Sequence, residues 1–99
     1  MNITKNAEGS KLTIALEGRM DTTTAPKLEA ELKASLNGVT ELVIDLAALK
    51  YISSAGLRVL LSAQKTMNAR QGRMELAGVN DSVRHVFDIT GFCDILTIE

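Results

Sequence analysis

The sequence predicts one α/β domain, residues 1–99, with a mostly parallel mixed β-sheet and covering helices. Strand-like and helix-like segments alternate along the chain, which is typical of parallel strands joined by helices. Residues 42–46 form a nearly unbroken apolar run, as in a strand that is covered on both faces. The length of 99 residues suffices for one hydrophobic core but not for a separate catalytic domain.

The first segments predict a β-hairpin. Residues 12–16 alternate in polarity and are followed by Gly18, which indicates a strand. A shorter strand is expected at residues 2–5. The two are joined by residues 8–10, which contain a glycine suited to a tight turn.

The first helix is expected to follow the threonine run at residues 22–24. A threonine cap followed by Pro26 in the first turn is a helix-start signal. Leucines recur every four residues from Leu28 to Leu36 and give the helix one apolar face, and Asn37 with Gly38 ends it.

The second half of the chain repeats this alternation. After the strand at residues 42–46, Ser53 and Ser54 offer a helix cap, and the helix is expected to stop at Gln71 and Gly72. The remaining elements are a strand at 74–77, a helix capped by Asn80 or Asp81 that ends near Gly91, and a strand at 95–98. The predicted order is β-β-α-β-α-β-α-β.

Charge and composition exclude several functions. The net charge is −1 and no run of Lys or Arg occurs, which argues against electrostatic binding of nucleic acid or of an anionic membrane surface. No apolar stretch approaches the roughly 20 residues of a membrane-spanning helix, so membrane insertion is not expected. The single cysteine, Cys93, allows no internal disulfide, which suits a cytoplasmic protein.

The sequence also argues against an enzyme. Ser54 does not lie in a G-x-S-x-G elbow, and His85 is the only histidine that could serve it as a base. No phosphate-binding glycine motif occurs, and no His/Cys cluster predicts a metal site. No catalytic residue, metal or cofactor is therefore expected.

The segment at residues 42–61 reads LVIDLAALKYISSAGLRVLL. It resembles the signature of STAS domains, in particular those of bacterial anti-sigma factor antagonists. Residues 18–21 and 24–26 resemble the G-x-x-D turn that leads into the first helix of that family, and Phe87 and residues 91–92 also fit. The resemblance covers essentially the whole chain and implies a single STAS domain.

In that family a regulatory serine lies at the start of the helix after the central strand, two positions before a glycine. The matching residue is Ser54, two before Gly56. The family pattern is Asp-Ser-Ser/Thr-Gly, so Ser53 replaces the usual aspartate and is an alternative phosphate acceptor. The Ser54 hydroxyl is also expected to cap the helix.

The resemblance implies a partner-switching cycle that regulates transcription. The unphosphorylated protein binds an anti-sigma factor, usually also a serine kinase with a GHKL-type ATP fold, and so frees a sigma factor. Phosphorylation of the serine releases the complex, and a PP2C-like phosphatase reverses it. The alternative is a non-phosphorylated STAS interaction module of a stress-sensing scaffold or of a lipid-transport complex.

The partner surface is expected where loops follow parallel strands, because those loops gather at one edge of the sheet. Asp21 is either a turn residue or a partner contact, and Arg58 is either a solvated charge or a partner for an acidic surface or for a phosphate on Ser54. Asp45 is expected to support the Ser54 loop by hydrogen bonding and not to bind a metal. The predicted partner-binding residues are Asp21, Thr22, Thr23, Ser53, Ser54, Ala55, Gly56 and Arg58.

Overall fold

The fold was obtained as a computed structural model that describes residues 1–91. Its element order, β-β-α-β-α-β-α, confirms the predicted alternation, and the strand predicted at residues 95–98 lies outside the described residues. The elements are β1 (Asn2–Glu8), β2 (Lys11–Met20), α1 (Ala25–Ser35), β3 (Glu41–Ile52), α2 (Ser54–Ala69), β4 (Arg73–Ala77) and α3 (Asp81–Thr90).

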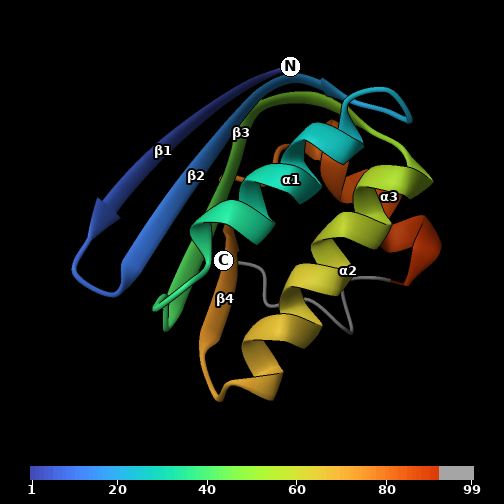
Figure 1. Cartoon of the computed structure of the whole chain (residues 1–99). Coiled ribbons are helices and arrows are strands. Elements are labelled where there is room, and N and C mark those ends of the chain that lie inside the picture. Colours follow the sequence, from blue (N-terminus) through green and yellow to red (C-terminus); the bar gives the residue numbers. More distant parts are fainter. Residues whose placement is uncertain (92–99) are drawn as a thin grey trace.

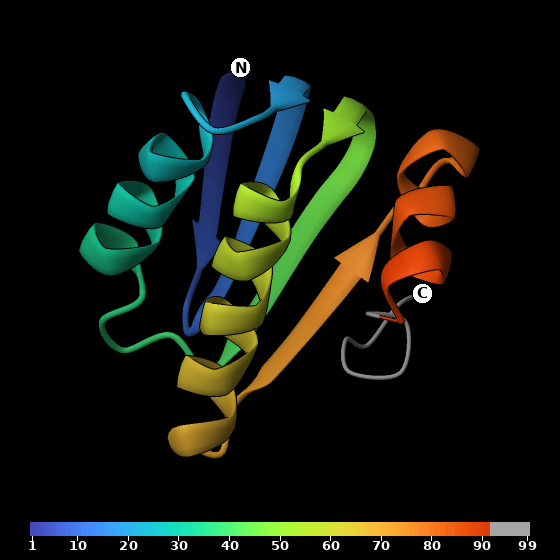
Figure 2. The same ribbon diagram turned by 90° about the vertical axis from the view of Figure 1, so that its right-hand side faces the viewer.

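The four strands form one mixed sheet in the order β1-β2-β3-β4. β1 and β2 pair antiparallel as the predicted hairpin, whereas β2 with β3 and β3 with β4 are parallel. Each parallel pair is joined by a helix, and these helices, α1 and α2, lie side by side over one face of the sheet (Figure 1). α3 packs against β3 on the side away from β1 (Figure 2).

One hydrophobic core fills the space between the sheet and the helices. Side chains of a strand alternate between its two faces, so every second residue of β2, of β4 and of the first half of β3 points into this core. Beyond Leu46 the alternation in β3 is interrupted, and its buried residues are Leu49 and Ile52. Each fully buried Leu or Ile side chain contributes roughly 1.5–3 kcal/mol to stability. The buried set includes Leu12, Ile14, Leu16, Leu42, Ile44, Leu46, Met74 and Leu76 from the strands and Leu28, Leu60, Met67, Val83 and Phe87 from the helices.

Two strands extend beyond their predicted ends. β2 runs to Met20 and β3 runs to Ile52, although their apolar patterns suggested ends near Gly18 and Leu46. The parallel register of the pair shifts twice, which indicates β-bulges that let both strands bend and continue. Gly18, with φ of 102°, lies at one of these shifts, where a residue with a side chain would be strained.

Candidate functional site

The extended ends of β2 and β3 determine where the candidate site lies. Met20 pairs with Ile52, so both strands end at the same level of the sheet. The backbone N–H of Ser53 then donates a hydrogen bond of 2.8 Å to the carbonyl oxygen of Met20. As a result, the turn that begins at Asp21 and the start of α2 lie next to each other.

Asp21 organises the turn between β2 and α1. Its Oδ1 accepts hydrogen bonds from the hydroxyl of Thr23 at 2.7 Å, from the Thr23 backbone N–H at 3.0 Å and from the Thr24 backbone N–H at 3.1 Å. These bonds, that of the Thr23 hydroxyl first, lower the pKa of Asp21 from 3.8 to about 2. Asp21 therefore stays ionised at neutral pH and is a fixed negative charge at this edge.

The prediction that the threonines cap α1 is wrong. Thr24 occupies the position before the helix, but its side chain makes no capping hydrogen bond. Its hydroxyl instead donates to the Arg19 carbonyl oxygen at 2.8 Å and accepts from the Asp21 backbone N–H at 2.8 Å. Thr22 and Thr23 are exposed. The threonines thus hold the Asp21 turn closed.

The two adjacent serines have different structural roles. Ser53 is the N-cap of α2, and its Oγ accepts a hydrogen bond from the Gly56 backbone N–H at 3.4 Å. Ser54 is the first residue of the helix and is exposed, and its hydroxyl makes no hydrogen bond to any residue within 1–91. The expectation that Ser54 caps the helix is therefore wrong, because its neighbour does so.

The remaining residues of the first turns of α2 differ in accessibility. Ala55 is half-buried and Arg58 is exposed, whereas Gly56 is buried. A Cβ atom on Gly56 would lie 2.8 Å from Ile52 Cγ1 and 2.8 Å from Met20 Sδ. The glycine is explained by close packing of α2 onto the strand ends, so its influence on a docking surface would be indirect.

Asp45 does not support the Ser54 loop. It lies within β3, seven residues before its end, and its Oδ1 accepts a hydrogen bond from the Ala47 backbone N–H at 2.9 Å. The Asp45 carboxylate also lies close beneath Gly78, where a Cβ atom would be 2.8 Å from Oδ1. Its role is to shape the bend of β3 beside the end of β4.

Two features near the site were not anticipated from the sequence. Arg19 and Tyr51 are paired across β2 and β3, and the Arg19 guanidinium lies 4.4 Å from the centre of the Tyr51 ring. Of the two predicted caps of α3, Asn80 and not Asp81 fills the position, through Oδ1, and its Nδ2 also donates to the Leu49 carbonyl at 2.6 Å and the Leu46 carbonyl at 3.3 Å. Only the strand register and the path of β3 reveal these contacts.

The described residues carry no sign of metal chemistry or of a membrane span. Within residues 1–91, no group of three or more His, Cys, Asp or Glu side chains is arranged to hold a metal ion. In the same residues, no helix is both long and apolar enough to cross a membrane. His85 is exposed on α3, and Cys93 lies outside the described residues.

Comparison with protein families decides the family. The STAS domain model matches residues 2–99. The chain belongs to the STAS family. This STAS domain is 39% identical over 99 residues to BtrV of Bordetella bronchiseptica, which is assigned as an anti-sigma factor antagonist; the match covers 99% of this chain and 85% of BtrV. It is 34% identical to the anti-sigma-B factor antagonist of Listeria monocytogenes, with coverage of 100% and 90%.

Solved structures agree with the fold of this STAS domain. The anti-sigma factor antagonist SpoIIAA in its unphosphorylated form has a TM-score of 0.85 at 20% identity, covering 99% of this chain and 88% of SpoIIAA. The phosphorylated form of the Bacillus cell fate determinant SpoIIAA gives 0.78 at 19% identity, with coverage of 99% and 91%. The mixed sheet and its helices are thus those of a STAS domain.

Proposed function

We propose that this STAS domain is an anti-sigma factor antagonist controlled by phosphorylation of Ser54. In the unphosphorylated state it binds, in the cytoplasm, an anti-sigma factor that is also a GHKL-type serine kinase. Phosphorylation of Ser54 ends that complex, and a PP2C-like phosphatase restores the binding state. The proposal rests on the names of relatives at 39% and 34% identity and on the geometry of Ser54. The domain acts by binding and has no catalytic activity of its own.

The observation that carries the proposal is the division of roles between Ser53 and Ser54. The cap is supplied by Ser53, so the Ser54 hydroxyl is exposed and free to react. Serine and aspartate are both good N-cap residues, and Ser53 therefore performs the capping role available to the aspartate of the usual family pattern. With Ser53 in place of that aspartate, Ser54 keeps its position as the first residue of α2.

A phosphate on Ser54 suits the fold but not an interface. At the first position of α2 it would meet free backbone N–H groups and the positive end of the helix dipole, so the domain stays folded. It would also add about −1.5 to −2 charges to an exposed surface beside ionised Asp21. Desolvating these charges against a partner costs several kcal/mol, and about 1.4 kcal/mol already weakens affinity tenfold.

The direct test is phosphate mapping with the GHKL-type kinases of the source organism. The purified chain is incubated with each kinase and ATP, and phosphopeptides are identified by mass spectrometry. We expect one kinase, termed the cognate anti-sigma factor below, to place one phosphate on Ser54. Ser54→Ala should take up none, whereas Ser53→Ala should still be modified.

Phosphate on Ser53 in the wild-type protein would identify Ser53, and not Ser54, as the regulatory phosphorylation site. Absence of phosphate with every such kinase, and in protein isolated from its native host, would contradict the proposal. That result would favour a constitutive STAS interaction module.

A further inference from the structure

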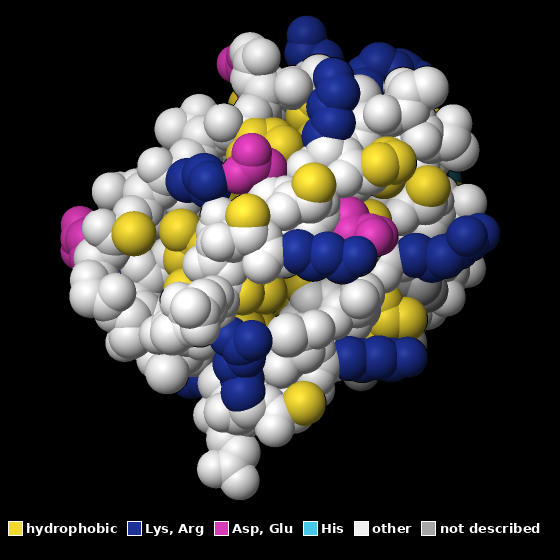
Figure 3. All heavy atoms as spheres, in the orientation of Figure 1, with side chains coloured by type: hydrophobic (Ala, Val, Ile, Leu, Met, Phe, Trp, Pro, Cys, Tyr) yellow, Lys and Arg dark blue, Asp and Glu magenta, His cyan; other side chains and the backbone are white. Residues whose placement is uncertain are grey.

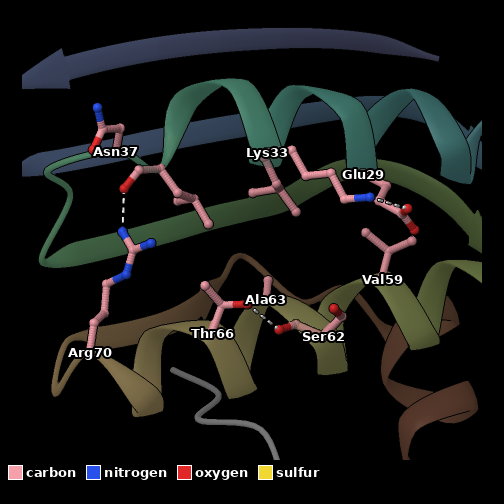
Figure 4. Close-up of a pocket in the computed structure, with 10 residues that line it drawn as sticks. Glu29, Lys33, Asn37, Val59, Ser62, Ala63, Thr66 and Arg70 are labelled. Atoms are coloured by element: carbon pink, nitrogen blue, oxygen red, sulfur yellow. Dashed lines mark hydrogen bonds and ion pairs between the residues drawn. The ribbon is translucent and has the colours of Figure 1, made fainter.

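A groove runs along the seam between α1 and α2 and begins beside the proposed phosphorylation site. It consists of two hollows, each of about 330 Å³, that share Glu29, Val59 and Ser62 in their walls. One hollow reaches Thr22 and Arg58, and the other extends to the opposite end of α2 (Figure 4). We call these two hollows together the α1–α2 groove.

The floor of the α1–α2 groove is apolar. Leu32, Leu36, Val59 and Ala63 line it and are almost fully buried, with exposures of 3–6%. On α2 the short side chains of Ser62 and Thr66 lie between the two arginines of the lining, and Figure 4 shows side chains of both helices facing each other across the seam. Such a shape accepts apolar side chains from above.

The α1–α2 groove is basic although the chain is acidic. Its lining holds three cations, Lys33, Arg58 and Arg70, against one carboxylate, Glu29, while the whole chain has a net charge of −1. Lys and Arg side chains are prominent over this face, with fewer acidic ones (Figure 3). The occupant that fits this charge is acidic.

The three cations differ in availability. Lys33 is paired with Glu29 at 3.1 Å, and Arg70 donates a hydrogen bond to the Leu36 carbonyl oxygen. Arg58 is exposed and has no ion-pair partner within residues 1–91. It also lies four residues after Ser54, which places the two side chains on the same face of α2, one turn apart.

We infer that the α1–α2 groove docks an acidic amphipathic helix of the cognate anti-sigma factor, with Arg58 binding one of its carboxylates. Arg70, the C-cap of α2, follows Arg58 by 12 positions, a rise of about 18 Å that matches roughly three turns of a docked helix. A helix in a groove uses apolar side chains at intervals of three and four for affinity, and its flanking carboxylates would meet the basic rim.

This inference rests on the proposed function and gives the phosphate a second effect. The cognate kinase transfers the γ-phosphoryl group of ATP to Ser54 Oγ, with loss of ADP and of the serine proton. The new phosphate can then pair with Arg58 one turn along α2 and compete with the partner's carboxylate. The switch would remove an attractive contact as well as add a repulsive charge.

The test measures the affinity of unphosphorylated full-length variants for the purified cognate anti-sigma factor. Arg58→Glu reverses the free cation, and Ser62→Trp places a bulky ring from an exposed position over both hollows. We expect each to weaken binding about tenfold or more. Affinity of the wild-type chain should fall as salt is raised, and this dependence should be smaller in Arg58→Glu.

Matched controls are placed at Arg84, an exposed arginine on α3 outside the groove. Arg84→Glu and Arg84→Trp should change affinity less than about twofold. Circular dichroism and melting temperature show that each variant is folded. For the wild-type chain, amide shifts on adding the partner should be largest along residues 59–66 and small on α3.

The outcomes separate the two proposals. If no kinase binds or modifies the wild-type chain, the proposed function fails. If the wild-type chain binds but folded Ser62→Trp binds equally well, or the amide shifts spare residues 59–66, the groove is not the docking site. Self-association of the chain that is lost in Ser62→Trp would assign the groove to a second copy and would also overturn the inference.

Discussion

The backbone N–H of Ser53 donates a 2.8 Å hydrogen bond to the carbonyl oxygen of Met20, which joins the end of β2 to the start of α2. This bond holds two segments side by side that are more than thirty residues apart in the chain. On one side of it Asp21 presents a fixed negative charge, and on the other Ser54 presents a free hydroxyl. A backbone hydrogen bond therefore positions the two segments of the site, and Asp21 and Ser54 supply its side chains.

Replacing each serine by alanine should separate capping from signalling. Ser53→Ala removes the acceptor of the Gly56 N–H, and we expect a loss of about 1 kcal/mol in the free energy of unfolding. Ser54→Ala removes an exposed hydroxyl without a partner and should stay within about 0.5 kcal/mol of wild type. Urea denaturation measures both, and a larger loss in Ser54→Ala would contradict the assigned roles.

The Asp21 turn predicts a pH-dependent difference in stability. Because the folded pKa of Asp21 is about 2, below its ordinary 3.8, the ionised form stabilises the fold above about pH 4. That contribution is lost as pH falls through about 2. The melting temperature of wild type relative to Asp21→Asn should accordingly fall over this range. A difference that is constant from pH 6 to pH 2 would show that the carboxylate charge does not stabilise the turn.

Gly56→Ala should destabilise the domain, contrary to the usual effect of alanine in a helix. Within a helix, alanine in place of glycine ordinarily raises the free energy of unfolding by about 1 kcal/mol. Here its Cβ would lie 2.8 Å from Met20 Sδ and from Ile52 Cγ1, so we expect a net loss of about 1–3 kcal/mol. Combining it with Met20→Ala should cost less than the sum of the two single changes. Additive losses would mean that the contact is not the cause.

Asn80→Ala should be among the more damaging polar substitutions on α3. It removes the helix cap and leaves the Leu46 and Leu49 carbonyls without their amide donor, for a loss of about 2–3 kcal/mol. Asn80→Asp keeps the cap acceptor but not the donor, so it should also destabilise. Ser82→Ala, at an exposed neighbouring position, is the control, and equal stability of Ser82→Ala and Asn80→Ala would refute this role.

The fold was largely predictable because its signals are local. Glycines that cap or closely follow the helices, the proline in the first turn of α1 and the apolar run of β3 each act over a few residues, and together they give the element order. The ends of β2 and β3 were not predictable in the same way. They depend on bulges in the pairing of the two strands, which no single segment encodes.

The candidate site, too, was predictable where its signals are local and not where it depends on contacts between distant segments. The signature at residues 53–56 marks the position of Ser54, but not which serine caps α2, since either hydroxyl suits an N-cap by type. In the structure Ser53 is the N-cap, and its N–H bonds to the Met20 carbonyl oxygen, a contact between distant segments. The same holds for the Arg19–Tyr51 pair, which needs the shifted register, and for the second role of Asn80.

The most direct test of the central claim is the dissociation constant for the cognate anti-sigma factor before and after stoichiometric phosphorylation of Ser54, with Ser54→Asp measured in parallel. We predict that phosphorylation weakens binding by about a hundredfold or more while the circular dichroism spectrum and the melting behaviour of the domain are retained. Unchanged affinity of a chain shown to carry phosphate on Ser54 would contradict the account, as would a loss of affinity that accompanies unfolding.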